Sequence, residues 1–403
     1  MTLITSPLAL TLLLAVAAYW LAKRRAISAA KGDVRSLAAL PTAYGTNAAL
    51  SVVIPAFVGF ILISLYSGLA PRAEDVAPLS KTWFILVPAV LGFVGAIALS
   101  TKDFRARTAS ERWILALLMG ASGVAILTTI GIVFSMLFET FNFFSQYSWT
   151  DFFFSTKWSP NFRGDSDLGI LPLLWGTLYI SFIALLVAVP IGLFSAVYLS
   201  EYAGPRMRAF AKPAIEVLAG IPTIVYGLFA LVTVGPLLRD YFAQPIGLGD
   251  SASSVLTAGL VMGVMLIPFV SSLSDDIINA VPQAMRDGSL GLGATKSETI
   301  RQVVVPAALP GIVGAILLAA SRAIGETMIV VLGAGAAARL SLNPLEAMTT
   351  VTVKIVSQLT GDTDFSAPET LVAFALGLTL FVLTLGLNVL ALIIVRRYRE
   401  QYE

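Results

Sequence analysis

The sequence predicts an all-α integral membrane protein. Hydrophobic residues make up 57% of its 403 positions, and charged residues make up only 12%. Apolar stretches near twenty residues, long enough to cross a bilayer as helices, recur along the chain between charged or turn-rich segments. The chain has no cysteine and no histidine, which excludes disulfides and any metal site or catalysis that depends on those residues.

Nine segments are apolar enough to cross a membrane. We place them at residues 3–22, 48–69, 83–100, 113–137, 170–199, 215–238, 253–273, 308–334 and 370–395. The third is the weakest because it is short and contains Pro88, although neighbouring helices can satisfy the carbonyl that a proline frees. In the first, the basic residues follow the apolar run, which favours a signal anchor over a cleaved signal peptide.

Lysine and arginine are distributed unevenly between the two sides of the predicted membrane domain. Loops on one side hold eighteen of the 26, and the alternate loops hold seven, with Arg322 inside a span. Cytoplasmic loops carry the excess of these residues in membrane proteins. We therefore expect a multi-pass membrane protein with a cytoplasmic C-terminus and, with nine spans, an external N-terminus.

The chain divides near residue 110. Residues 1–110 form three spans without recognisable chemistry, and residues 111–403 form six spans joined by distinctive loops. The external segment 139–169 is rich in aromatic residues. We expect most of these aromatic side chains to anchor at the membrane interface, and a docking surface for an external partner is the alternative.

One charged pair lies inside an apolar segment. Arg322 and Glu326 are the only charged residues from Gln302 to Ala338. A charge at bilayer depth costs about 2.5–3.5 kcal/mol on insertion scales, so such charges usually face a polar pathway or a partner. Their spacing of four residues predicts that both lie on one face of one helix. The pair indicates an anion pathway, and the alternative is a lock between two helices.

The cytoplasmic loop before the eighth span has a helical pattern of its own. We expect a short helix after Pro282, a glycine break around 291–293, and a second helical piece over 296–302. The first helix is too short and too polar to cross a membrane. It is therefore expected to form a knob at the cytoplasmic surface.

The same loop contains a near-match to a nucleotide-binding motif. Gly288 and Gly293 are followed by Lys296, but Ala294 and Thr295 intervene. A phosphate-binding P-loop needs Gly, Lys and Ser or Thr to be contiguous, so that the backbone amides and the lysine converge on the phosphates. We therefore expect a separate ATPase to supply any energy from ATP.

The loop resembles the coupling loop in the permease subunits of bacterial ABC importers. That loop has Glu-Ala-Ala, three residues, Gly, nine residues, and then Ile-x-Leu-Pro. The positions that match at the same spacing are Asp287, Gly288, Ser289, Gly293, Val303, Val305 and Pro306. Asp287 stands in place of the glutamate and is also acidic. Gly288 and Ser289 stand in place of the two alanines and are also small, although Gly288 lowers helix propensity.

This resemblance implies an architecture and a mechanism. Residues 111–403 would form the six-span core of a type I ABC importer permease, and residues 1–110 would be an extension of three further transmembrane helices. Segment 282–306 would dock into the ATP-hydrolysing subunit and carry its motion to the attached spans.

Further segments resemble the phosphate-specific, Pst-type branch of these permeases, and PstC most. They are Trp-Gly-Thr-Leu at 175–178, Leu-Ser-Glu-Tyr at 199–202, Gly-Ile-Pro-Thr at 220–223 and Ser-Arg-Ala-Ile-Gly-Glu-Thr at 321–327. The sister subunit PstA shares related motifs, so the choice between the two stays open. The resemblance implies a PstB-like ATPase, a second, PstA-like permease and a PstS-like periplasmic phosphate-binding protein as partners, beside membrane lipid and without nucleic acid. ATP and Mg would bind on the ATPase, and this chain would bind no cofactor.

Three residues are candidates for the substrate pathway: Arg322, Glu326 and Thr223. Arg322 offers a planar fork suited to bidentate contact with a tetrahedral oxyanion. Glu326 would hold Arg322 in place or accept a hydrogen bond from a protonated phosphate oxygen, a proton that sulfate lacks at neutral pH. Thr223 follows a Gly-Ile-Pro break whose freed backbone groups suit a polar lumen, and a packing kink is the alternative. We hypothesise that Arg322→Gln or Glu326→Gln abolishes phosphate uptake while assembly stays normal.

Other functions remain open from the sequence. The first alternative is a permease for another oxyanion, sulfate or molybdate, which competition with labelled phosphate would separate. The second is a scaffold subunit that senses phosphate status. A membrane-embedded enzyme is disfavoured because the spans lack histidine, cysteine and any clustered acidic triad.

Overall fold

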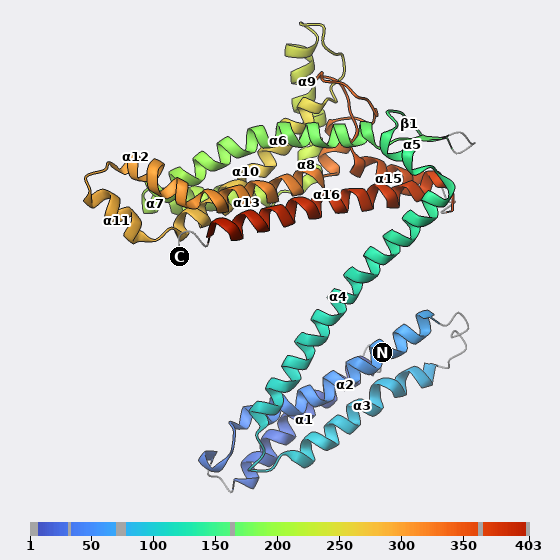
Figure 1. Ribbon diagram of the computed structural model, residues 1–403. Coiled ribbons are helices and arrows are strands. Elements are labelled where there is room, and N and C mark those ends of the chain that lie inside the picture. The colour runs from blue at the N-terminus through green and yellow to red at the C-terminus, as the bar shows by residue number, and fades with distance from the viewer. Residues whose placement is uncertain (1–6, 31–33, 70–77, 162–165, 362–365, 400–403) are drawn as a thin grey trace. The chain divides into compact units, whose positions relative to one another are not determined.

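The computed structural model describes residues 7–30, 34–69, 78–161, 166–361 and 366–399 (Figure 1). Within these residues, nine helices are long and apolar enough to cross a membrane, which confirms the predicted all-α class and number of spans. The first predicted span begins at residues 3–6, which lie outside the described residues. The chain divides into two compact units, Met1–Gly131 and Ile132–Glu403.

The 1–131 unit is built from three helices and the first part of a fourth. These are α1 (Pro7–Ala29), α2 (Pro41–Leu69), α3 (Pro78–Leu99) and α4 (Ala106–Gln146), with a short 3₁₀ turn at Val34–Ser36. Small side chains face the interior, and Ala18, Ala22 and Ala48 are fully buried. Small residues allow membrane helices to approach closely, since van der Waals packing rather than hydrophobic burial holds them together.

The 132–403 unit contains the remaining helices. They are α5 (Trp149–Phe154), α6 (Leu171–Val197), α7 (Pro205–Ala219), α8 (Thr223–Phe229), α9 (Gly235–Leu238), α10 (Val255–Ala280), α11 (Gln283–Gly291), α12 (Lys296–Thr299), α13 (Val305–Ile324), α14 (Met328–Gly333), α15 (Val351–Gly361) and α16 (Pro368–Arg399). π-helical turns at Tyr198–Tyr202, Ala230–Val234, Arg239–Ala243 and Ile300–Val304 extend or join them. Two short strands, β1 (Trp158–Ser159) and β2 (Asp167–Leu168), pair antiparallel.

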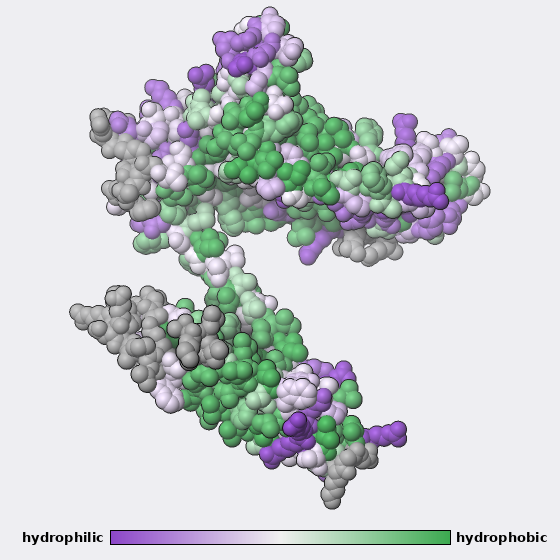
Figure 2. Space-filling view, turned by 180° about the vertical axis from the view of Figure 1, so that it is seen from behind, coloured by the Kyte–Doolittle hydropathy of each residue, from purple (hydrophilic) through white to green (hydrophobic). Residues whose placement is uncertain are grey.

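Helix α10 is the central element of the 132–403 unit. It packs against α6, α13 and α7, and its Met262 and Leu266 side chains are fully buried. Gly192 of α6 lies against Val270 with no room for a side chain, so the two helices are in close contact. Figure 1 shows α11 and α12 at one end of this helical bundle and α5, β1 and α15 at the other. Figure 2 shows a broad hydrophobic surface across its middle, with hydrophilic residues at its ends, as a membrane domain requires.

Several predicted spans have different boundaries in the structure, and three of these differences bear on the site. The span expected at 215–238 begins at Thr223, because the Gly220–Pro222 break separates it from α7. The span expected at 253–273 continues to Ala280. The span expected at 308–334 ends at Ile324, since Gly325 follows as the C-cap and α14 starts anew at Met328.

The aromatic segment before α6 differs from its prediction. Phe143 and Phe152 are fully buried, and their rings meet edge to face at a centroid distance of 5.5 Å. The Tyr147 hydroxyl accepts a hydrogen bond from the Leu168 backbone N–H at 3.0 Å. Phe143 and Phe152 therefore belong to a core shared with β2, α6, α15 and α16. The expectation of interface anchors was wrong for these two residues; Phe141, Trp149 and Phe154 are exposed.

Candidate functional site

A cavity of about 280 Å³ lies where α7, α8, α10 and α13 meet. Its lining brings together Arg322 and Thr223, two of the three predicted pathway residues, although they lie 99 positions apart in the sequence. Phe269 and Ser272 of α10 and Glu216 of α7 complete its polar and aromatic wall. The helix break before Thr223 is therefore part of the cavity as well as a kink.

Arg322 occupies the last turn of α13. Its guanidinium carbon lies 5.8 Å from the centre of the Phe269 ring, a cation–π contact that supports the charge without using its N–H donors. Among the described residues, the guanidinium makes no salt bridge and no hydrogen bond. The planar fork is thus free to bind an anion in the cavity.

Glu326 lies in the turn between α13 and α14. Its Oε1 accepts hydrogen bonds from the backbone N–H groups of Met328 at 3.0 Å and Ile329 at 3.4 Å. The predicted placement of Arg322 and Glu326 on one face of one helix was wrong, because α13 ends between them. Glu326 does not line the cavity, and its carboxylate satisfies the first amides of α14.

Thr223 is the first residue of α8 and follows Pro222 directly. Across the break, the Tyr226 hydroxyl donates a hydrogen bond to the carbonyl oxygen of Leu218 at 2.8 Å. This bond satisfies one of the carbonyls at the end of α7 that have no helical partner. The end of α7 and the start of α8 are consequently tied to each other at the cavity wall.

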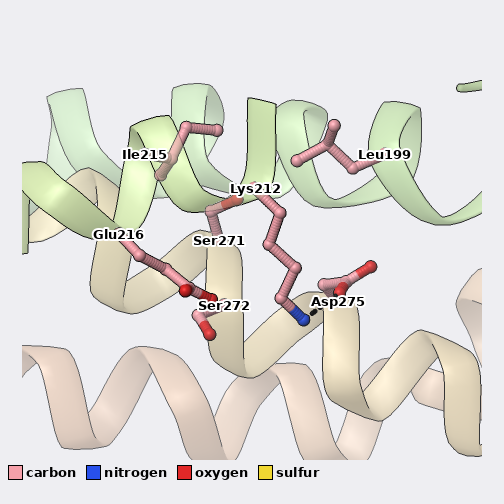
Figure 3. A pocket seen from close by; sticks show the side chains of 7 residues that line it. All are labelled: Leu199, Lys212, Ile215, Glu216, Ser271, Ser272 and Asp275. Carbon is pink, nitrogen blue, oxygen red and sulfur yellow. Dashed lines mark hydrogen bonds and ion pairs between the residues drawn. The ribbon is translucent and has the colours of Figure 1, made fainter. Parts of the chain in front are cut away.

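An ionic cluster that the sequence did not reveal lies beside the cavity. The Asp275 carboxylate of α10 accepts hydrogen bonds from Lys212 Nζ at 2.8 Å and from Arg208 at 3.0 and 3.1 Å. Figure 3 shows the Lys212 side chain extending from α7 to Asp275, with Glu216 next to Ser272. The hydrogen bond to Asp275 raises the pKa of Lys212, so this side chain is charged at physiological pH.

The sequence carried one signal for this cluster. Arg208, Lys212 and Glu216 follow each other at intervals of four residues, which places them on one face of α7. From this spacing alone, an ion pair between Lys212 and Glu216 would be expected. In the structure Lys212 pairs with Asp275 and Asp276 of α10 instead.

The cytoplasmic loop has the predicted local structure. Helix α11 runs over Gln283–Gly291, and Gly293 adopts φ +89°, a conformation that favours glycine. Thr295 and Glu298 form a capping box that starts α12. The helix–break–helix prediction is therefore confirmed.

The motif positions of this loop are exposed or half-buried. Asp287 and Gly288 are exposed on α11, where Asp287 accepts a hydrogen bond from the Gln283 amide at 3.0 Å. The Ser289 hydroxyl lies 3.0 Å from that of Thr299 and links α11 to α12. Val303, Val305 and Pro306 lie where the π-helical turn passes into α13. Leu292, between the two helices, is 91% exposed and leaves an apolar tip uncovered.

One arginine fixes the loop to the membrane domain. Arg286 of α11 forms a salt bridge with Glu201 at 3.0 Å, and each of these side chains is only 12% exposed. The same guanidinium donates to the carbonyl oxygens of Ile278, at 2.7 Å, and Val281 at the end of α10. Because this one guanidinium bonds both to Glu201 and to the last carbonyls of α10, it ties α11 to the end of α10.

Residues 188–400 match the family described as the binding-protein-dependent transport system inner membrane component. The chain belongs to this family. Residues 8–77 match a second family, described as phosphate ATP-binding cassette transporter. The N-terminal extension is thus itself a recurring family segment, a relation that its plain apolar sequence did not reveal.

Named relatives cover most of the permease. The phosphate transport system permease protein PstC of Mesorhizobium japonicum is 32% identical, over 72% of this chain and 88% of that protein. PstC 1 of Mycobacterium tuberculosis is 36% identical, over 61% of this chain and 81% of its own length. The probable ABC transporter permease protein YqgH of Bacillus subtilis is 32% identical, over 67% of this chain and 84% of that protein. These relatives are transport permeases, and this chain is accordingly a multi-pass inner-membrane permease and not an enzyme.

A solved structure supports the fold. The crystal structure of a bacterial alginate ABC transporter, in complex with an alginate-bound periplasmic protein, matches with a TM-score of 0.50. The match covers 73% of this chain and 97% of that chain at 16% identity. At this identity the likeness concerns the permease fold alone.

Proposed function

We propose that this permease is the transmembrane subunit of an ATP-driven importer for inorganic phosphate. The observation that carries the proposal is the free guanidinium of Arg322 in a cavity at two helix ends, in a chain similar to PstC proteins over most of its length. A planar fork without a protein acceptor suits the paired oxygens of a tetrahedral oxyanion. The hydroxyl of Thr223, on the same cavity wall, offers a further hydrogen bond.

Glu326 does not line the cavity, so in this proposal it acts on the anion where the anion passes the end of α13. Its carboxylate is an acceptor, so it favours an anion that still carries a proton and repels one that does not. Phosphate carries such a proton at neutral pH and sulfate does not. Two backbone N–H groups, of Met328 and Ile329, donate hydrogen bonds to Glu326 and hold its carboxylate next to the end of α13.

The assembly requires partners. A periplasmic phosphate-binding protein of the PstS type would deliver the anion at the outer face, and a second, PstA-like permease would complete the pathway. A PstB-like ATPase, with ATP and Mg bound to it, would dock on the loop 282–306, and this chain would bind no cofactor. Leu290 and Leu292, two positions apart and 47% and 91% exposed, give this loop apolar surface for a partner to cover, which supports this docking site. The excess of positive charge on that side supports a cytoplasmic C-terminus and an external N-terminus.

Transport by the reconstituted complex tests the proposal. Vesicles that contain both permeases and the ATPase, supplied with the binding protein, are expected to accumulate labelled phosphate only when ATP is present. A hundredfold excess of unlabelled phosphate should abolish the signal, and the same excess of sulfate or molybdate should not. Accumulation that sulfate or molybdate suppresses as strongly as phosphate would overturn the assignment of the substrate.

A further inference from the structure

The buried carboxylate of Asp275 has a contact set unlike any other described charge. It is 1% exposed and carries three donors: Lys212 and Arg208 from α7, and the Asn279 amide of its own helix at 2.9 Å. A buried carboxylate is stable only when it is paired and hydrogen-bonded. Loss of either the charge or the cations would therefore leave a strongly unfavourable group inside the unit.

Helix α7 has few other attachments. None of its residues is buried, and it carries its cations on the face that meets α10. The contacts of Arg208 and Lys212 to Asp275 are the shortest bonds that hold α7 on α10; Arg208 also reaches Asn279, and Lys212 reaches Asp276, each at 3.4 Å. Because α7 continues through the break into α8, its position decides where Thr223 lies in the cavity wall.

The other end of the connection lies at the cytoplasmic loop. Arg286 joins α11 to the end of α10 and to Glu201. Asp275 lies less than two turns before that end, in the same helix. A displacement of α11 therefore moves α10, and Asp275 is the point at which the movement passes to α7.

We infer that Asp275 is a positioning residue that couples the cytoplasmic loop to the substrate cavity through α7. The inference rests on the proposed function, since it needs an ATPase on the loop and an anion in the cavity. Asp275 touches neither of them. Its role is to keep α7 and α10 moving together, so that each ATP hydrolysed changes the access of the cavity.

The test separates hydrolysis from transport. Asp275→Asn is placed in the complete complex in vesicles, and ATP hydrolysis stimulated by the binding protein is measured together with uptake of labelled phosphate. We expect hydrolysis to continue, while phosphate moved per ATP falls about tenfold or more, the size of a typical coupling free energy. Asp275→Glu, which keeps the charge, should restore part of the phosphate moved per ATP hydrolysed.

A matched control lies one residue away. The Asp276 side chain is 67% exposed, and among the described residues its ion pair is with Lys212, at 3.4 Å. Asp276→Asn should leave the ratio of transport to hydrolysis unchanged. Lys212→Gln serves as a second, milder variant if Asp275→Asn assembles poorly, because Arg208 still pairs with Asp275 in it; its ratio should fall less.

The possible failures are distinct. An assembled Asp275→Asn or Lys212→Gln complex with the wild-type ratio, or with hydrolysis and transport lowered equally, would overturn the inference. Failure of the wild-type complex to move phosphate would instead overturn the proposed function. The two failures are therefore distinguishable in one set of vesicles.

Discussion

The two units of this permease use different forces to pack their helices. In the 1–131 unit, α1, α2 and α3 meet through small apolar side chains, and the one described salt bridge, Arg107–Glu111, lies on the exposed surface of α4. In the 132–403 unit, charged side chains pair between helices: the buried Asp275 with the partly exposed Arg208 and Lys212, and the half-buried Arg286 with Glu201. Close apolar packing is suited to a fixed bundle, whereas paired charges hold a definite geometry between elements that move.

The largest effect is expected from overfilling the apolar bundle. A Cβ on Gly92 would lie 1.8 Å from the carbonyl oxygen of Ser51, so Gly92→Leu must push α2 and α3 apart. We expect a loss of about 3 kcal/mol in the stability of this unit, as overpacking costs in tight cores. Unfolding of the purified protein in denaturing detergent measures it.

The control for this change is in the same helix. A Cβ on Gly95 would meet no atom of a neighbouring helix within 4 Å, so Gly95→Leu should be near neutral. Equal stability of the Gly92→Leu variant and the wild type would show that α2 and α3 are not packed as described.

A second effect, about tenfold, is expected at Glu326. Glu326→Gln keeps an oxygen that can accept from the Met328 and Ile329 amides, so the cap of α14 survives. The variant loses the charge, and hydrogen bonds to charged groups are worth about 1.5–3 kcal/mol, so phosphate uptake should fall about tenfold or more at a normal membrane level. Wild-type uptake by Glu326→Gln would limit this residue to capping.

The fold and the site differ in how much of each the sequence predicts. The nine spans, the break before Thr223 and the helices around Gly293 follow from local patterns of apolar, proline and glycine residues. The contact of Lys212 with Asp275 joins residues 63 positions apart, and local spacing offered Glu216 as its partner. The prediction that Arg322 and Glu326 lie on one face of one helix failed for a related reason. A four-residue spacing indicates a shared face only where the helix continues, and α13 ends before Gly325.

A smaller effect is expected at the tip of the cytoplasmic loop. Leu292→Asp places a charge on the most exposed apolar side chain of the loop and should weaken association with the ATPase by roughly 1–2 kcal/mol, as for one interface residue. Co-purification at decreasing concentration measures it. Leu342→Asp, at another exposed leucine far from this loop in the sequence, should leave the association unchanged.

The smallest effect is expected at the surface pair of α4. Arg107 and Glu111 are four residues apart and both exposed. Arg107→Ala should change stability by no more than about 0.5 kcal/mol, since exposed ion pairs of this kind are worth little. A change larger than about 1 kcal/mol in detergent unfolding would mean that this pair is part of the packing of the 1–131 unit.

The central claim is that the free guanidinium of Arg322 contacts the transported anion. Phosphate uptake by vesicles that contain Arg322→Gln, Arg322→Lys or the wild-type permease at equal level tests it most directly. We expect Arg322→Gln to lose about a hundredfold in uptake and Arg322→Lys, which keeps the charge but not the fork, to lose less. Uptake by Arg322→Gln within a factor of about two of the wild type, well under 1.4 kcal/mol, would contradict the account.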